Sequence, residues 1–155
     1  MSELLTPVMS NQVSLLYAEY TKVRKPRLTE EQFAYLTKIY PALLVCMSDD
    51  VLDEEEWDGI VKITYGLAEE FMNSPTDDKE LIAVAFRTEF RYLLDHIDKW
   101  RKKFLNALKD SIKDDKMDKE FVLETMYLFA NISGGISAEE QSEIDALSHR
   151  LELEY

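Results

Sequence analysis

Apolar residues at helical spacing run through almost the whole chain, and this constrains the fold more than any other feature. One example is the series Phe33, Leu36, Tyr40 and Leu43. Residues spaced three or four positions apart share one side of an α-helix, whereas no segment shows the two-residue alternation of a strand. The 155 residues include only four Gly and four Pro, which indicates few turns. The sequence therefore predicts an all-α, single-domain bundle of about six to seven helices over residues 1–155.

Several short patterns predict where helices begin. In a capping box, a Ser, Thr or Asp caps the helix and a Glu or Gln three positions later bonds back to the cap. The pairs are Thr29 with Gln32, Asp53 with Glu56, and Ser137 with Glu140. Ser74 followed by Pro75 predicts one more helix start, because Pro suits the first helical position.

Residues 75–113 form a long stretch with two apolar faces. After Pro75 the stretch contains neither Gly nor Pro. One face consists of Leu81, Ala85, Thr88 and Tyr92, and the other of Ile82, Phe86, Phe90 and Leu93. We expect a central helix covered on several sides, with a bend or short break near residues 95–98, because an unbroken helix of this length is unusual in a globular domain.

The charge balance narrows the choice of partners. The chain has 31 acidic and 18 basic residues and a net charge of −13, which repels nucleic-acid phosphates. A cation, or a protein partner with a basic or apolar patch, fits better. The basic cluster Lys22, Arg24, Lys25 and Arg27 at the end of the first predicted helix complements the helix dipole and needs no ligand.

The cysteine content and the absence of long apolar runs indicate the cellular compartment. The single cysteine, Cys46, excludes an internal disulfide and lies in an apolar helical run, which indicates a buried side chain. No apolar run is long enough to span a membrane, and residues 1–7 do not resemble a signal peptide. We therefore expect a cytoplasmic protein without membrane insertion.

An internal repeat relates two helix–loop–helix units, at about residues 33–71 and 117–155. Residues 46–56 read Cys-Met-Ser-Asp-Asp-Val-Leu-Asp-Glu-Glu-Glu, and residues 130–140 read Ala-Asn-Ile-Ser-Gly-Gly-Ile-Ser-Ala-Glu-Glu. The offset is 84 residues, as from position 49 to position 133. Each copy has a small residue, a short loop, an aliphatic residue, a cap and a Glu at the third helical position. We expect the two loops to lie side by side at one end of the bundle.

This pattern resembles the tellurite-resistance TerB-like family, whose consensus Ala-x-x-Asp-Gly-x-Val/Ile-Ser-x-x-Glu occurs twice in an all-helical chain. The resemblance implies a single helical domain, acidic residues that face a divalent cation, and an association with stress or envelope-linked complexes without an established reaction. Only Asp49, Glu56 and Glu140 match the acidic positions, because Asp50 stands where the family has Gly and Ser133 where it has Asp.

The candidate metal residues are therefore Asp49, Glu56 and Glu140, with Ca²⁺ or Mg²⁺ as the cation, since both prefer oxygen ligands. An EF-hand is excluded, because its required Gly and final Glu are replaced by Glu54 and Ile60. The alternative is a solvated acidic helix start that the helix dipole stabilises.

Two functions remain open at this point. The first is a non-enzymatic, stress-associated helical module that interacts with a partner protein and binds a divalent cation at its acidic loops. The alternative is a structural or oligomerising protein that binds a helix through the apolar edge of residues 75–113. No phosphate-binding loop or nucleophile–base motif indicates an enzyme, and a metal hydrolase would need His96 or His149 in a pocket with carboxylates.

Overall fold

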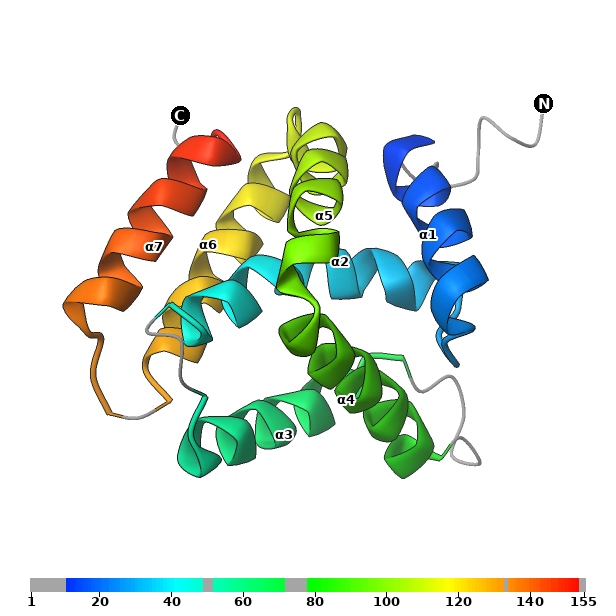
Figure 1. Ribbon diagram of the computed structural model, residues 1–155, viewed down its shortest axis with the longest axis horizontal. Helices are drawn as coiled ribbons and strands as arrows, with labels where there is room; N and C mark the ends of the chain where they lie inside the picture. Colours follow the sequence, from blue (N-terminus) through cyan, green and yellow to red (C-terminus); the bar gives the residue numbers. More distant parts are fainter. Residues whose placement is uncertain (1–10, 49–51, 72–77, 133, 154–155) are drawn as a thin grey trace.

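The computed structural model describes residues 11–48, 52–71, 78–132 and 134–153, which form seven α-helices (Figure 1). The predicted all-α class is confirmed, and no strand occurs in these ranges. None of the described helices is both long and apolar enough to cross a membrane. The helices are α1 (Asn11–Arg24), α2 (Glu30–Cys46), α3 (Glu54–Glu69), α4 (Lys79–Asp95), α5 (Ile97–Ile112), α6 (Lys116–Ala130) and α7 (Ala138–Arg150).

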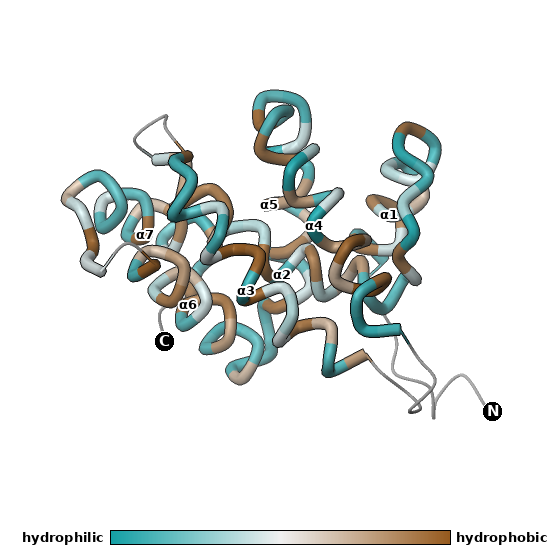
Figure 2. Tube along the Cα trace, turned by 90° about the horizontal axis from the view of Figure 1, so that it is seen from below, coloured by the Kyte–Doolittle hydropathy of each residue, from teal (hydrophilic) through white to brown (hydrophobic). Residues whose placement is uncertain are grey.

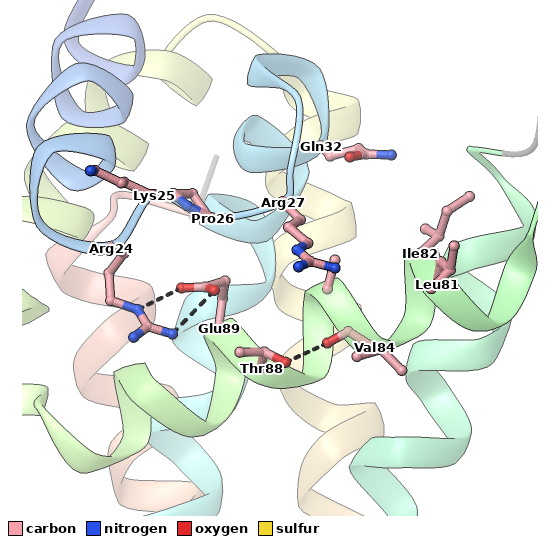
Figure 3. Close-up of a pocket in the computed structure, with 11 residues that line it drawn as sticks. Arg24, Lys25, Pro26, Arg27, Gln32, Leu81, Ile82, Val84, Thr88 and Glu89 are labelled. Atoms are coloured by element: carbon pink, nitrogen blue, oxygen red, sulfur yellow. Dashed lines mark hydrogen bonds and ion pairs between the residues drawn. The ribbon is translucent and has the colours of Figure 1, made fainter.

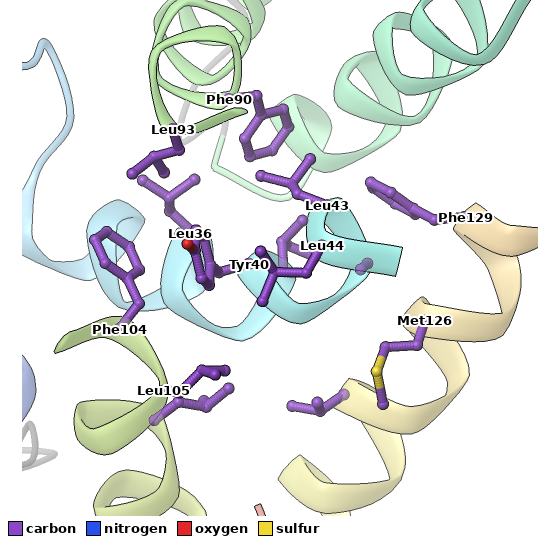
Figure 4. Close-up of a cluster of buried hydrophobic side chains, with 14 of the residues drawn as sticks. Leu36, Tyr40, Leu43, Leu44, Phe90, Leu93, Phe104, Leu105, Met126 and Phe129 are labelled. Atoms are coloured by element: carbon purple, nitrogen blue, oxygen red, sulfur yellow. The ribbon is translucent and has the colours of Figure 1, made fainter. Parts of the chain in front are cut away.

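The central helix is α2. Every residue from 39 to 46 is buried, so this part of α2 has no face exposed to water. It contacts α1, α4, α5, α6 and α7. Figure 4 shows its side chains Leu36, Tyr40, Leu43 and Leu44 between those of α4, α5 and α6. A helix that is apolar on all sides belongs in the interior, because only there can every face be removed from water.

The expectation that residues 75–113 form the central element was wrong. In α4, Phe86, Phe90 and Leu93 are fully buried, but Leu81 and Val84 face solvent. Helix α4 carries charged side chains, Arg87 and Arg91 among them, whereas residues 39–46 of α2 carry none. Hydrophobic segments accordingly gather in the middle of the molecule around α2, and the outer turns of the peripheral helices are more hydrophilic (Figure 2).

The break predicted near residues 95–98 is confirmed. It falls at His96, whose φ of −134° and ψ of 40° are not helical. The His96 N–H donates to the carbonyl of Leu93 at 3.2 Å and ends α4, and the His96 carbonyl accepts from Trp100 N–H at 3.3 Å to begin α5. The break lets α4 and α5 leave α2 in different directions (Figure 1).

The three predicted capping boxes are present at the starts of α2, α3 and α7. The start of α4 differs from the prediction: Asp78 caps it, with its carboxylate accepting from Glu80 N–H at 2.9 Å. Ser74 and Pro75, predicted to begin this helix, lie outside the described residues. Asp is as good an N-cap as Ser, so the sequence contained two adequate starts four residues apart.

A cluster of buried aromatic rings holds α1 against α2 and α5. Tyr20 of α1 is fully buried, with its ring centroid 5.0 Å from that of Trp100 and 5.2 Å from that of Phe33. Phe33 in turn lies 5.6 Å from Phe104. Tilted and edge-on aromatic pairs at these distances are favourable beyond their buried area. The cluster fixes the C-terminal end of α1, and with it the connection to α2.

Candidate functional site

The predicted metal residues are engaged in helix capping where the structure describes them. At the start of α3, Glu56 Oε1 accepts from Asp53 N–H at 3.4 Å and Glu56 N–H donates to Asp53 Oδ1 at 2.8 Å. Glu56 is only 7% exposed. The first N–H groups of a helix have no partner within the helix, so the Glu56 side chain completes the helix end.

The second copy has the same arrangement. Glu140 Oε1 accepts from Ser137 N–H at 2.9 Å, and Glu140 N–H donates to Ser137 Oγ at 3.0 Å. Asp49 lies outside the described residues. Among the residues that the structure does describe, no group of three or more His, Cys, Asp or Glu side chains could hold a metal ion.

The ends of α2 and α6 and the starts of α3 and α7 lie at the same end of the bundle (Figure 1). Ile132, at the end of α6, contacts Gly59 of α3 so closely that a Cβ atom on Gly59 would lie 2.3 Å from Ile132 Cγ2. Ser48, at the end of α2, borders a hollow whose other residues, Glu143 among them, all belong to α7. The offset of 84 residues relates Ser48 to Ile132 and Gly59 to Glu143. Each first helix therefore ends against the second helix of the other unit.

A separate pocket of about 550 Å³ lies between the α1–α2 connection and α4 (Figure 3). We call it the groove. One wall is the chain from the end of α1 to the start of α2, and the other is the N-terminal half of α4. Its lining residues are Arg24, Lys25, Pro26, Arg27, Gln32, Leu81, Ile82, Val84, Ala85, Thr88 and Glu89.

Glu89 lines the groove and joins α4 to α1. Its carboxylate, 4% exposed, accepts from Arg24 Nε at 3.0 Å, from Arg24 Nη2 at 3.2 Å and from Tyr20 Oη at 2.6 Å. The Arg24 guanidinium also lies over the Tyr92 ring, 4.1 Å from its centroid. A planar guanidinium that donates two hydrogen bonds to one carboxylate holds a fixed orientation, so this part of the groove is preorganised.

The protonation states in this network are well defined. Burial raises the pKa of the Tyr20 phenol far above its ordinary value, and the hydrogen bond to Glu89 raises it further. The hydrogen bond to Glu89 also raises the pKa of the Arg24 guanidinium. Tyr20 therefore remains a neutral donor and Arg24 a cation at any physiological pH. The charge of Arg24 is balanced by Glu89.

Two further cations of the lining, Lys25 and Arg27, are not neutralised by a carboxylate in this way, and we call them the rim of the groove. Lys25 and Arg27 are exposed and form no ion pair with any residue in the described ranges. Lys25 has a φ of 50°, the left-handed conformation that often follows a helix and that Gly adopts more easily. The rim is positive, although the whole chain has a net charge of −13.

The α4 wall is apolar, and part of it faces solvent. Leu81, Val84, Ala85 and Thr88 line it at positions i, i+3, i+4 and i+7. Leu81 is 62% exposed and Val84 is 38% exposed. The Thr88 hydroxyl donates to the Val84 carbonyl at 2.7 Å, so this polar group is satisfied within the helix. The groove thus combines an apolar wall with a cationic rim.

Both walls had signals in the sequence that were interpreted differently. The helix dipole accounts for the basic cluster at residues 22–27 in the sequence analysis. The face with Leu81, Ala85 and Thr88 is predicted there to be covered by other helices or, in the alternative function, to remain as an apolar edge that binds a helix. Glu89 and Arg24 are 65 residues apart, so no local pattern could pair them. His96 and His149 are both exposed, the ring of His96 stacks on Tyr92, and neither histidine lines the groove.

Comparison of the chain with protein-family models, curated proteins and solved structures found no match. The resemblance to the TerB-like family therefore stays a prediction.

Proposed function

We propose that this protein is a non-enzymatic helical module that binds a segment of a partner protein in the groove. The observation that carries the proposal is the exposure of Leu81 and Val84 along the α4 wall. Each CH₂ group removed from water contributes about 0.8 kcal/mol, so covering a leucine and a valine side by side can supply much of the free energy of a protein contact. The proposal combines the two functions predicted from the sequence, because the module binds its partner through the apolar edge of residues 75–113.

The size and chemistry of the groove support binding. Its volume of about 550 Å³ falls within the range of sites that enclose a small ligand or several side chains. Its only carboxylate, Glu89, is committed to Arg24 and Tyr20. The rest of the lining consists of aliphatic groups, cations, a satisfied hydroxyl and the Gln32 amide, which can bind and orient a peptide.

The stress-associated role and the divalent cation at Asp49, Glu56 and Glu140 remain separate predictions from the family resemblance. A calorimetric titration of wild type and Asp49→Ala with Ca²⁺ and Mg²⁺ tests the cation. Heat of binding that disappears in Asp49→Ala would support it, and no heat with wild type would end it. Neither result affects the groove, which lies on other elements.

Selection of peptides from a random display library tests the proposed function. We expect wild type to enrich peptides that fail to bind the double variant Leu81→Ser/Val84→Ser. Leu128→Ser is the matched control, because Leu128 is 54% exposed on α6 and does not line the groove. Peptides that bind all three proteins equally, or no enrichment at all, would refute binding in the groove.

A further inference from the structure

We infer that the occupant of the groove is an amphipathic helix of a partner protein, with leucine-like side chains on one face and Asp or Glu along its edge. This inference rests on the proposed function, since it names the chemistry of the segment that the groove binds. Three features support it: the spacing of the apolar wall, the charge of the rim and the fixed position of Glu89.

The apolar wall has the periodicity that a helix recognises. Leu81, Val84, Ala85 and Thr88 extend along about two turns of α4, or roughly 10 Å at 1.5 Å per residue. A partner helix that lies along this wall presents its own residues at i, i+3, i+4 and i+7 over the same length. The α1–α2 connection forms the opposite wall of the groove (Figure 3).

The rim selects the sign of the partner's charge. Lys25 and Arg27 stand at the wall opposite the leucine, exposed and without an ion pair in the described part of the chain. A carboxylate on the edge of the bound helix would reach these cations, whereas a lysine there would be repelled. Guanidinium groups bind carboxylates with two parallel hydrogen bonds, so Arg27 adds orientation as well as charge.

Two carboxylates that neighbour groove residues in the sequence already have partners. Glu80, next to Leu81, already contacts Arg87 and Tyr65, and Glu30 accepts a hydrogen bond from Ser14 at 3.5 Å. The net charge of −13 acts over longer distances, and physiological salt screens exposed charges beyond about 8 Å. Contacts at the rim therefore decide the preference.

Glu89 determines where a partner's carboxylate can bind, because it occupies Arg24, the third cation of the groove. It neutralises Arg24 and leaves that guanidinium bound to α4 and stacked on Tyr92. A partner carboxylate would otherwise compete for Arg24 deep in the groove. With Arg24 committed, the polar contacts of the partner fall at the rim and its apolar side chains fall in the interior, which is the arrangement of an amphipathic helix.

Three synthetic peptides of one amphipathic design test the inference. They share the leucine face and differ only in the edge residues, which are Glu, Gln or Lys. Fluorescence anisotropy on the full chain should show the Glu peptide binding about tenfold more tightly than the Gln peptide, the effect of two rim ion pairs, and the Lys peptide more weakly than either.

Two variants should remove this preference without unfolding the protein. Lys25→Gly removes a charge and relieves the left-handed backbone at φ 50°, and Arg27→Gln removes the other. The double variant should bind the Glu and Gln peptides equally. Lys62→Gln, the same charge change at an exposed site on α3 outside the groove, should keep the tenfold preference. A thermal melt of each variant confirms that it is folded.

The outcomes separate the two proposals. If all three peptides bind equally and Leu81→Ser/Val84→Ser abolishes binding, the groove binds a protein segment but the acidic partner is refuted. If that double variant binds as well as wild type, the proposed function fails too. If sedimentation shows self-association that Leu81→Ser removes, the occupant is a second copy of this chain. If the protein binds only to vesicles of anionic phospholipid, the occupant is a membrane surface. Either result overturns the inference.

Discussion

The starts of α3 and α7 and the groove at the end of α1 use charge in opposite ways. At the helix starts, the Glu56 and Glu140 carboxylates bond to backbone N–H groups and complete the helices α3 and α7. In the groove, Glu89 neutralises one cation, and Lys25 and Arg27 remain exposed without an ion pair in the described residues. The acidic residues at the helix starts are the more conspicuous feature of the sequence. The groove, however, contains the two cations, Lys25 and Arg27, that form no ion pair within the described residues.

The comparison teaches that a concentration of charge in the sequence does not by itself locate a binding site. A carboxylate at the third position of a helix is already partnered, because the fold supplies N–H donors there. A cation in the turn after a helix has no such obligatory partner. The substitutions that follow test the contacts on both sides of this comparison, in order of decreasing expected effect on stability.

The largest effect is expected from Glu89→Ala. It leaves Arg24 and Tyr20 without their shared acceptor, and removing one partner of a buried charge pair typically costs about 3 kcal/mol of unfolding free energy. Urea denaturation measures the loss. The control is Glu19→Ala, whose ion pair with Lys103 is half exposed on both sides and should contribute less than about 1 kcal/mol. Equal losses in the two variants would show that Glu89 does not organise the groove.

The next effect compares two glycines of α3. Gly59→Ala places a Cβ atom 2.3 Å from Ile132 Cγ2, and the resulting overpacking should cost about 2 kcal/mol despite the better helix propensity of Ala. Gly66→Ala meets no atom within 4 Å and should stabilise the protein by about 1 kcal/mol. Thermal denaturation of both variants tests how closely the two repeat units pack.

Ile132→Ala provides a check on the cause. Combined with Gly59→Ala, it opens the space that the new methyl group needs, so the double variant should lose less stability than the sum of the two single variants. Simple additivity would mean that α3 and the end of α6 are not in contact in solution.

A smaller loss of stability is expected from Tyr20→Phe, and it should differ from the effect of Tyr40→Phe. Tyr20→Phe removes the hydroxyl that donates to Glu89 at 2.6 Å and should cost about 1.5 kcal/mol, because the acceptor is charged. The Tyr40 hydroxyl is buried and has no hydrogen-bond partner among the described residues, so Tyr40→Phe should be neutral or stabilising. Chemical denaturation compares the two; a larger loss in Tyr40→Phe would contradict the network.

The dependence of stability on alkaline pH provides a second test of the contact between Tyr20 and Glu89. The folded protein keeps the Tyr20 phenol neutral, since burial and Glu89 raise its pKa above the ordinary value of about 10. The stabilisation is therefore complete below that pH and is lost as pH rises above it. Tyr20→Phe should show a weaker loss of stability over this range than wild type, and identical pH profiles would argue against a buried Tyr20.

The sequence predicted the features that depend on neighbouring residues. Capping boxes at Thr29, Asp53 and Ser137 and the break at His96 follow from local hydrogen bonding and helix length, and all are present. The central position of α2 could also have been found, because residues 39–46 contain no charged side chain. Periodicity identified the apolar faces of residues 75–113, but it could not say which face the rest of the chain leaves uncovered.

The groove could not be predicted, because it exists only where distant segments meet. Arg24 and Glu89 read separately as ordinary surface charges, and only folding reveals the pair. Leu81 and Ala85 belong to one apolar face by spacing, yet the first is 62% exposed and the second 8% exposed. Which of them α1 and α2 cover depends on helix packing angles that helical periodicity does not contain.

The smallest effect on stability is expected from Glu56→Gln and Glu140→Gln. Gln replaces Glu in a capping box with the same acceptor oxygen, so each variant should lose less than about 0.5 kcal/mol, whereas Glu56→Ala loses the back-bond and should cost about 1 kcal/mol. Thermal melts with and without millimolar Ca²⁺ measure both properties at once. A cation bound at Asp49, Glu56 and Glu140 would raise the melting temperature of wild type by mass action and would do so less in the Gln variants, since each has lost a charged ligand. If Ca²⁺ shifts wild type and both Gln variants equally, these carboxylates act only in capping, and the contrast between the helix starts and the groove holds in its strongest form.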